Sequence, residues 1–189
     1  MSFSEAFRIL NGLKRRKVIR DYVVIGAIAA TAYMEPIFTE DLGVIVLADS
    51  DEEYLHTFHR VGELAEGQEG MHHILGGVPV QMFPSNTKPL FRDTLDQSLP
   101  VKFGRLRSKS ASAEHLILLY LEPFREKDRI RILSLMPNAN KPKLLELLRR
   151  YDDEKGKLTR RLQELYGDGF PGEGEMAPKA GKNEPDQED

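Results

Sequence analysis

The sequence predicts an α/β (α+β) fold in which a mixed sheet is flanked by helices and followed by a helical C-terminal portion. Three observations lead to this prediction. Short apolar runs punctuated by glycine occur as far as about Lys109, and from Ser112 onward apolar residues recur at helical spacing. Beyond Gly167 apolar residues become rare. We therefore expect one domain over residues 1–166, with a sheet-rich part at about 21–109 and a helical part at about 112–166.

The predicted elements follow the chain in order. Periodicity predicts a helix before residue 18, a strand at 21–25 and, opened by Gly26, a helix of small residues at 27–34. A run that is apolar on both faces predicts a central strand at 42–47, and an acidic first turn begins a helix at 51–65. Because paired glycines readily adopt positive φ, Gly76 and Gly77 predict a hairpin. The remaining elements are the hairpin strands 71–75 and 78–83, a helix at 88–97, a strand at 101–109, and helices at 112–121, 125–135, 141–151 and 153–166.

Composition excludes several classes of protein. The chain contains no cysteine, so disulfides, thiolate nucleophiles and cysteine zinc sites are absent. No apolar run reaches membrane-spanning length and the N-terminus does not resemble a signal peptide, so we expect a cytoplasmic protein with no membrane partner. The segment 167–189 has seven acidic residues against two lysines, and we expect it to be a disordered acidic tail. The overall charge of −3 then leaves a nearly neutral domain.

The segment with the clearest chemical pattern spans residues 23–47. A glycine-opened helix at Gly26 and Ala27 would present free backbone N–H groups to a phosphate, although close packing of strand and helix explains small residues equally well. Asp41 stands at the start of the next strand, where it could hold a divalent cation. Alternatively, Asp41 could be a turn residue that pairs with Thr39.

This segment resembles the nucleotidyltransferase superfamily, whose members have a Gly-Gly or Gly-Ser turn followed by Asp-x-Asp. The closer resemblance is to the abortive-infection nucleotidyltransferase toxins, through Gly77-Val-Pro-Val80 and through residues 113–121 followed by Lys127-Asp128-Arg129. The resemblance implies transfer of a nucleoside monophosphate from an NTP to a hydroxyl of a nucleic-acid or protein acceptor. It also implies a catalytic, Mg²⁺-binding Asp41. It places the nucleotide against five residues, namely Gly26, Ala27, Thr39, Lys127 and Asp128.

The chain departs from this pattern at several positions. The acidic motif is Asp41-Leu42-Gly43, so the second carboxylate is missing, and the later strand offers only the amide of Gln81. Tyr120 stands where the family has a lysine. Two functions stay open: a weakened Mg²⁺-dependent transferase, or a catalytically degenerate member that binds nucleotide. A non-catalytic interaction module, such as a toxin–antitoxin component, is the alternative. The missing groups favour a degenerate protein with weak Mg²⁺ binding.

The remaining charged residues have simpler interpretations. The basic residues Arg8, Arg20 and 14–17, with Arg105, Arg107 and Lys109 on one strand face, could follow a phosphate backbone, but solvated surface charge is favoured. Asp128 is expected on a helix surface, paired with Arg125 or Arg131. Among the histidines, His56 and His59 are expected on an exposed helix face, His72 and His73 on opposite strand faces, and His115 in a structural role.

Overall fold

The computed structural model describes residues 3–167. Its strands are β1 (Tyr22–Ile25), β2 (Leu42–Val46), β3 (Gly67–Glu69), β4 (His72–Leu75), β5 (Val78–Pro84), β6 (Leu99–Phe103) and β7 (Leu106–Ser110). Its helices are α1 (Phe3–Arg15), α2 (Gly26–Ala30), α3 (Asp51–Gly62), α4 (Pro89–Asp96), α5 (Ala113–Leu121), α6 (Glu126–Leu135), α7 (Lys141–Tyr151) and α8 (Lys157–Tyr166), with a 3₁₀ turn, η1 (Met136–Asn138). None of these helices is both long and apolar enough to cross a bilayer.

The strands form one mixed sheet in the order β3-β4-β5-β2-β1-β7-β6. β1 and β2 are antiparallel, whereas β2 pairs with β5, and β1 with β7, in parallel. This register aligns Ile25, Gly43, Gln81 and His72 in one row across four strands. Because directly paired residues share a face of the sheet, the four positions face the same side. The predicted mixed sheet flanked by helices is confirmed.

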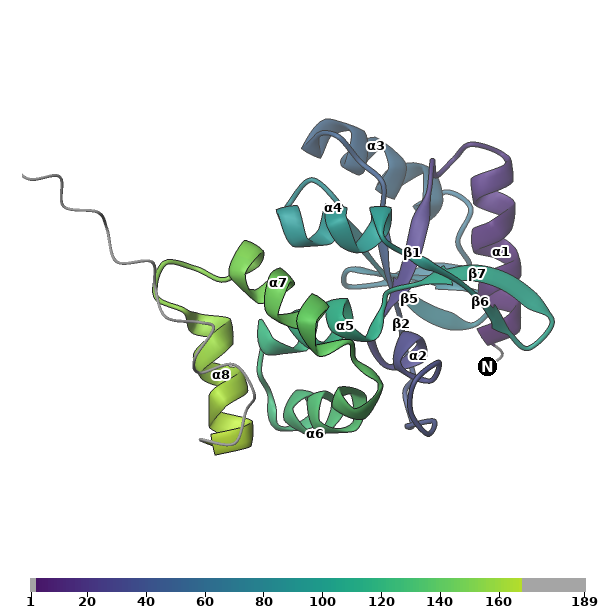
Figure 1. Ribbon diagram of the computed structural model, residues 1–189. Coiled ribbons are helices and arrows are strands. Elements are labelled where there is room, and N and C mark those ends of the chain that lie inside the picture. Colours follow the sequence, from purple (N-terminus) through teal and green to yellow (C-terminus); the bar gives the residue numbers. More distant parts are fainter. Residues whose placement is uncertain (1–2, 168–189) are drawn as a thin grey trace, which may run out of the picture.

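Helices cover both faces of the sheet (Figure 1). On one face, α1 reaches Tyr22 through a hydrogen bond from the tyrosine hydroxyl to Asn11, and α3 packs its Phe58 ring on His73. On the other face, α5 contacts α2, and Phe91 of α4 meets Phe83 of β5 edge to face. Eight of the nine residues of α5 are buried, because α6, α7 and α8 surround this helix. The cleft described below lies on the α5 face of the sheet.

Some boundaries differ from the sequence-based predictions. The predicted strand at 101–109 is the hairpin β6–β7, because Gly104 takes a positive φ of 61° and reverses the chain. Arg105 therefore lies in the turn and not on one strand face with Arg107 and Lys109. The predicted helix at 27–34 is shortened to the five residues of α2, and the polar strand β3 was not predicted. All but the first residue of the predicted acidic tail, 167–189, lies outside the described residues.

The buried imidazole of His73 predicts loss of stability in mild acid. Neither ring nitrogen forms a hydrogen bond of normal geometry with the described residues, and burial lowers the pKa of His73 below its usual value of 6.5. Protonation therefore favours the unfolded chain, in which the histidine pKa is ordinary. The contribution of neutral His73 to the free energy of unfolding should be present above about pH 6.5. It should be lost as the pH falls below this value, by at most about 1.4 kcal/mol per pH unit for this single proton.

Melting curves of the parent and of His73→Phe between neutral pH and pH 5 test this expectation. The phenylalanine fills the same space against Phe58 and cannot be protonated, so its melting temperature should fall less over this range. His115 is also buried, which lowers its pKa as well, so some pH dependence should persist in the variant. Equal pH dependence in both proteins would contradict the role assigned to His73.

Candidate functional site

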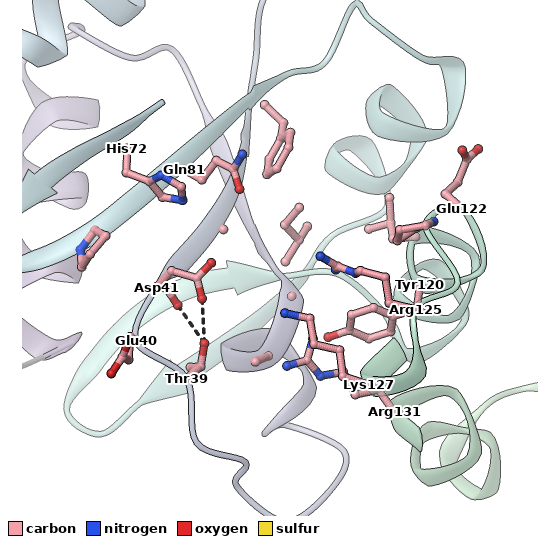
Figure 2. A pocket seen from close by; sticks show the side chains of 18 of the residues that line it. Thr39, Glu40, Asp41, His72, Gln81, Tyr120, Glu122, Arg125, Lys127 and Arg131 are labelled. Atoms are coloured by element: carbon pink, nitrogen blue, oxygen red, sulfur yellow. Dashed lines mark hydrogen bonds between the residues drawn. The ribbon is translucent and has the colours of Figure 1, made fainter. Parts of the chain in front are cut away.

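A cleft of about 1040 Å³ opens between the sheet and the α5–α6 region (Figure 2). The sheet wall comes from the ends of β1 and β2 and from β4 and β5. The opposite wall comes from the end of α5 and the first turns of α6. The polar side chains that line the cleft are Thr39, Glu40, Asp41, Glu69, His72, Gln81, Lys88, Tyr120, Glu122, Arg125, Lys127 and Arg131.

The sheet wall contains the acidic motif. Asp41 directly precedes β2, and its Oδ1 accepts a hydrogen bond of 2.7 Å from the Thr39 hydroxyl. Gly43 lies two residues further on the same strand face and is flanked by Ile25 and Gln81 in the register. At the position where a second carboxylate would stand beside Asp41, the cleft therefore holds a hydrogen atom.

Gly26 and Ala27 also line the cleft, where β1 passes directly into α2. Gly26 adopts a φ of +70°, and a Cβ atom at this position would meet no atom within 4 Å. The turn thus requires glycine for its backbone conformation and not for space. Because α2 has only five residues, the dipole at its N-terminus is small. A strongly positive potential in the cleft must come from side chains.

The helical wall provides that positive charge. Arg125, Lys127 and Arg131 line the cleft and point toward Asp41 and Thr39 (Figure 2). Asp128 is fully buried and does not line the cleft. Its carboxylate accepts hydrogen bonds from Nε of Arg125, at 2.8 Å, and from the Arg125 backbone N–H, at 3.1 Å.

Asp128 therefore caps α6 and holds the Arg125 guanidinium at the cleft wall. The expected pairing of Asp128 with arginine is present, but the expected surface position is wrong. Of Lys127 and Asp128, only Lys127 can contact a ligand in the cleft directly. Sequence reasoning treated Arg125 and Arg131 as partners of Asp128 and missed their place in the cleft.

Tyr120 is the most unusual polar group of the site. The residue is only 4% exposed, and its hydroxyl forms no hydrogen bond of normal geometry with the described residues. Burial raises the pKa of the phenol to about 12 although the guanidinium of Arg131 lies 5.4 Å from the ring centroid. The hydroxyl is therefore protonated at neutral pH and can donate a hydrogen bond. It points into the cleft beside the basic side chains (Figure 2).

The far end of the cleft is apolar and aromatic. Phe83 of β5 and Phe91 of α4 lie with ring centroids 6.0 Å apart. Lys88 lies 5.7 Å from the centroid of the Phe91 ring and forms an ion pair of 2.9 Å with Glu122. This end was not singled out from the sequence, because its residues belong to three separate elements that only the fold brings together.

The donor set fits one Mg²⁺ ion only if a ligand supplies further oxygens. Mg²⁺ requires six ligands and is commonly held by one or two carboxylates together with phosphates and water. Asp41 is the carboxylate toward which the basic side chains of the opposite wall point (Figure 2), and no group of three His, Asp or Glu side chains within residues 3–167 could hold a metal. A second ion, which would need a carboxylate at position 43, does not fit.

The histidines do not add a metal site. His72 lines the cleft, whereas its neighbour His73 is buried on the opposite face of the sheet, as expected from strand alternation. His56 and His59 are exposed on α3. His115 is buried and bonded to Ser112 and Asp93, which is a structural arrangement.

Comparison with known proteins supports the fold. No protein-family model and no curated protein matches this chain. A solved structure described as an antigenic nucleotidyltransferase-like protein from Paracoccidioides brasiliensis is similar, with a TM-score of 0.58 and 14% sequence identity over 87% of this chain and 88% of that chain. At this identity the similarity concerns the fold alone. The chain therefore has a nucleotidyltransferase-like fold.

Proposed function

We propose that this protein is a degenerate nucleotidyltransferase-fold protein that binds a nucleoside triphosphate in the cleft and transfers nucleotide slowly or not at all. One observation carries the proposal: three cations of the helical wall point toward Asp41 (Figure 2), and a glycine stands at position 43, where a second carboxylate would lie on the same strand face.

The basic wall supports binding of a polyphosphate. Arg125 and Arg131 share the one carboxylate of Asp128, at 2.8 and 3.6 Å, so together with Lys127 the wall keeps two positive charges in excess. Arginine can bind phosphate through two parallel hydrogen bonds. The Tyr120 hydroxyl, at the same wall, donates no hydrogen bond of normal geometry to residues 3–167. The backbone N–H groups at Gly26 and Ala27 would add neutral donors from the opposite side.

The aromatic end supports a nucleoside and not a bare polyphosphate. Flat bases stack on aromatic rings irrespective of base identity. Phe83 and Phe91 offer such rings next to the polar side chains of Lys88 and Glu122. A ligand with a polyphosphate at one end and an aromatic base at the other would match both ends of the cleft.

The incomplete acidic motif supports weak catalysis. Asp41 would hold one Mg²⁺ ion together with the phosphate oxygens, and the ion would supply charge neutralisation. A second ion, which would activate an acceptor hydroxyl, has no carboxylate to bind at position 43. As finer proposals, we place the chain with the abortive-infection toxin group, in the cytoplasm, and we propose a nucleic-acid or protein acceptor for any residual transfer.

Calorimetry on the parent and on Lys127→Gln tests the proposed ligand. Lys127 is exposed and forms no ion pair with the described residues, so its replacement should leave the fold intact. We expect Mg-NTP to bind the parent at millimolar concentration or better, and the variant to bind roughly tenfold more weakly, since one charged contact is lost. The exposed Lys155, exchanged in the same way, is the matched control.

Two outcomes would contradict the proposal. If the parent binds neither Mg-NTP nor inorganic tripolyphosphate at millimolar concentration, the cleft is not a polyphosphate site. Robust transfer of radiolabelled nucleotide by the parent, lost in Asp41→Ala, would show an active enzyme instead of a degenerate one.

A further inference from the structure

We propose that residues 184–189 of this chain, called here the acidic segment, contact the basic wall of the cleft and compete there with the polyphosphate. The basic wall consists of Arg125, Lys127 and Arg131. The contact follows from the charges of the wall and of the segment, whereas its effect on ligand binding rests on the proposed function.

The basic wall carries charge that the described fold does not neutralise. Two positive charges remain in excess, because Arg125 and Arg131 share the one carboxylate of Asp128 and Lys127 forms no ion pair with a carboxylate of residues 3–167. Asp41, on the opposite wall, is hydrogen-bonded to Thr39. The wall can therefore accept an anionic partner without first losing an ion pair of Lys127.

A buried polar group at the same wall also indicates an anionic partner. Tyr120 is only 4% exposed, and its hydroxyl forms no hydrogen bond of normal geometry with residues 3–167. The hydroxyl points into the cleft beside the three cations (Figure 2). A carboxylate oxygen, like a phosphate oxygen, can accept a hydrogen bond from a phenol. The wall thus combines positive charge with a neutral donor for an oxyanion.

The acidic segment has the charge that the wall requires. Its sequence is Glu-Pro-Asp-Gln-Glu-Asp, so four of its six residues are carboxylates and none is basic. In residues 168–183 three carboxylates are accompanied by Lys179 and Lys182. Negative charge is therefore most concentrated in 184–189, and this segment matches the two uncompensated charges of the wall better than the residues before it.

The described chain ends beside the helix that carries the wall. Arg129 of α6 pairs with Glu164, in the last turn of α8, at 2.7 Å. α6 has ten residues and is about 15 Å long, and Lys127 lies in its first turn. The sixteen residues 168–183 can span up to about 50 Å. The acidic segment, which lies outside the described residues, can therefore reach Lys127 from the end of α8.

The covalent connection makes even a weak contact effective. A group on a linker that spans the required distance is present at its site at a millimolar effective concentration. A contact with a dissociation constant in this range would occupy the wall for part of the time. A polyphosphate carries more charge at closer spacing, so it should displace the segment once its concentration is high enough. The segment would then set the ligand concentration at which the cleft fills.

Calorimetry with inorganic tripolyphosphate tests the competition in the full chain. The neutralised variant carries four substitutions, namely Glu184→Gln, Asp186→Asn, Glu188→Gln and Asp189→Asn. At about 50 mM salt it should bind tripolyphosphate about three- to tenfold more tightly than the parent, because its cleft has no internal competitor. The difference should shrink at about 200 mM salt, since salt screens the contact between the segment and the wall.

A matched control removes the same charge from exposed carboxylates that do not line the cleft. Its substitutions are Glu52→Gln, Glu63→Gln, Glu146→Gln and Glu154→Gln. The control should bind tripolyphosphate within about twofold of the parent. If both variants gain affinity equally, only net charge matters and the inference is wrong. It is also wrong if the neutralised variant binds as the parent does.

Cross-linking with a carbodiimide detects the contact without any ligand. This reagent joins an amine directly to a carboxylate, so it should link Lys127 to the acidic segment within one chain. Lys17 is the control, because it is exposed and does not line the cleft. We expect several-fold more product at Lys127 than at Lys17, and less product at Lys127 when tripolyphosphate is added. Mass spectrometry of mixed labelled and unlabelled protein identifies links within one chain.

The two measurements separate this inference from the proposed function. If neither the parent nor the neutralised variant binds tripolyphosphate or Mg-NTP, while Lys127 still cross-links preferentially, the contact holds and the proposed function fails. If the parent binds polyphosphate but Lys127 gives no more product than Lys17, the proposed function stands and the inference is overturned.

Discussion

Replacing Gly43 by Asp should tighten Mg²⁺-dependent nucleotide binding at least about tenfold, provided that the cleft holds Mg-NTP as proposed. The new carboxylate would emerge on the same strand face as Asp41, between Ile25 and Gln81. Two carboxylates on one face can hold a divalent cation that one carboxylate holds weakly. The measurement is calorimetric titration of NTP with and without Mg²⁺, followed by a radiolabelled transfer assay, in which we expect an increase over the parent.

The asparagine variant at the same position is the matched control. A Cβ atom at Gly43 would lie 3.2 Å from Cγ1 of Ile25, so this flexible side chain must move by a few tenths of an ångström in either variant. Gly43→Asn and Gly43→Asp should therefore melt at similar temperatures, and only the aspartate should tighten metal-dependent binding. Equal binding by the parent and both variants, with the fold intact, would show that Asp41 is a turn residue partnered by Thr39.

Patterns that are local in the sequence predicted most of the fold. Gly76 and Gly77 both take positive φ and close the predicted hairpin, and the apolar run at 42–47 is the central strand β2. Gly104 shows the limit of this reasoning. A single glycine within an alternating segment can be a bulge or a turn, and only the pairing of β6 with β7 decides between them.

The candidate site could be predicted only in part, because its two walls come from distant segments. Asp41 and Gly43 are close in sequence, so strand alternation was enough to place them on one face. Arg125 and Arg131 belong to a dense run of charges that reads as a solvated helix. The buried carboxylate of Asp128 orients the Arg125 guanidinium, and the burial of Asp128 depends on how α6 packs against α5. The aromatic end of the cleft likewise depends on the packing of α4 against the sheet.

The Tyr120 hydroxyl should lower the stability of the free protein and strengthen its binding of polyphosphate. The variant Tyr120→Phe tests both effects. In the free protein the buried hydroxyl forms no hydrogen bond of normal geometry with residues 3–167, a state that costs about 1–3 kcal/mol, so its removal should raise the melting temperature. The phenylalanine keeps the ring against which the Arg131 guanidinium lies. With a polyphosphate bound, the hydroxyl would donate to a charged oxygen, and its loss should weaken affinity roughly tenfold or more. Because the phenol, with a pKa of about 12, stays protonated near neutral pH, the difference in affinity between parent and variant should not change between pH 6 and 9.

Calorimetry with Mg-NTP and with inorganic tripolyphosphate, together with melting curves, provides the test. A variant that is less stable and binds both ligands as the parent does would show that the hydroxyl serves the fold and not the ligand.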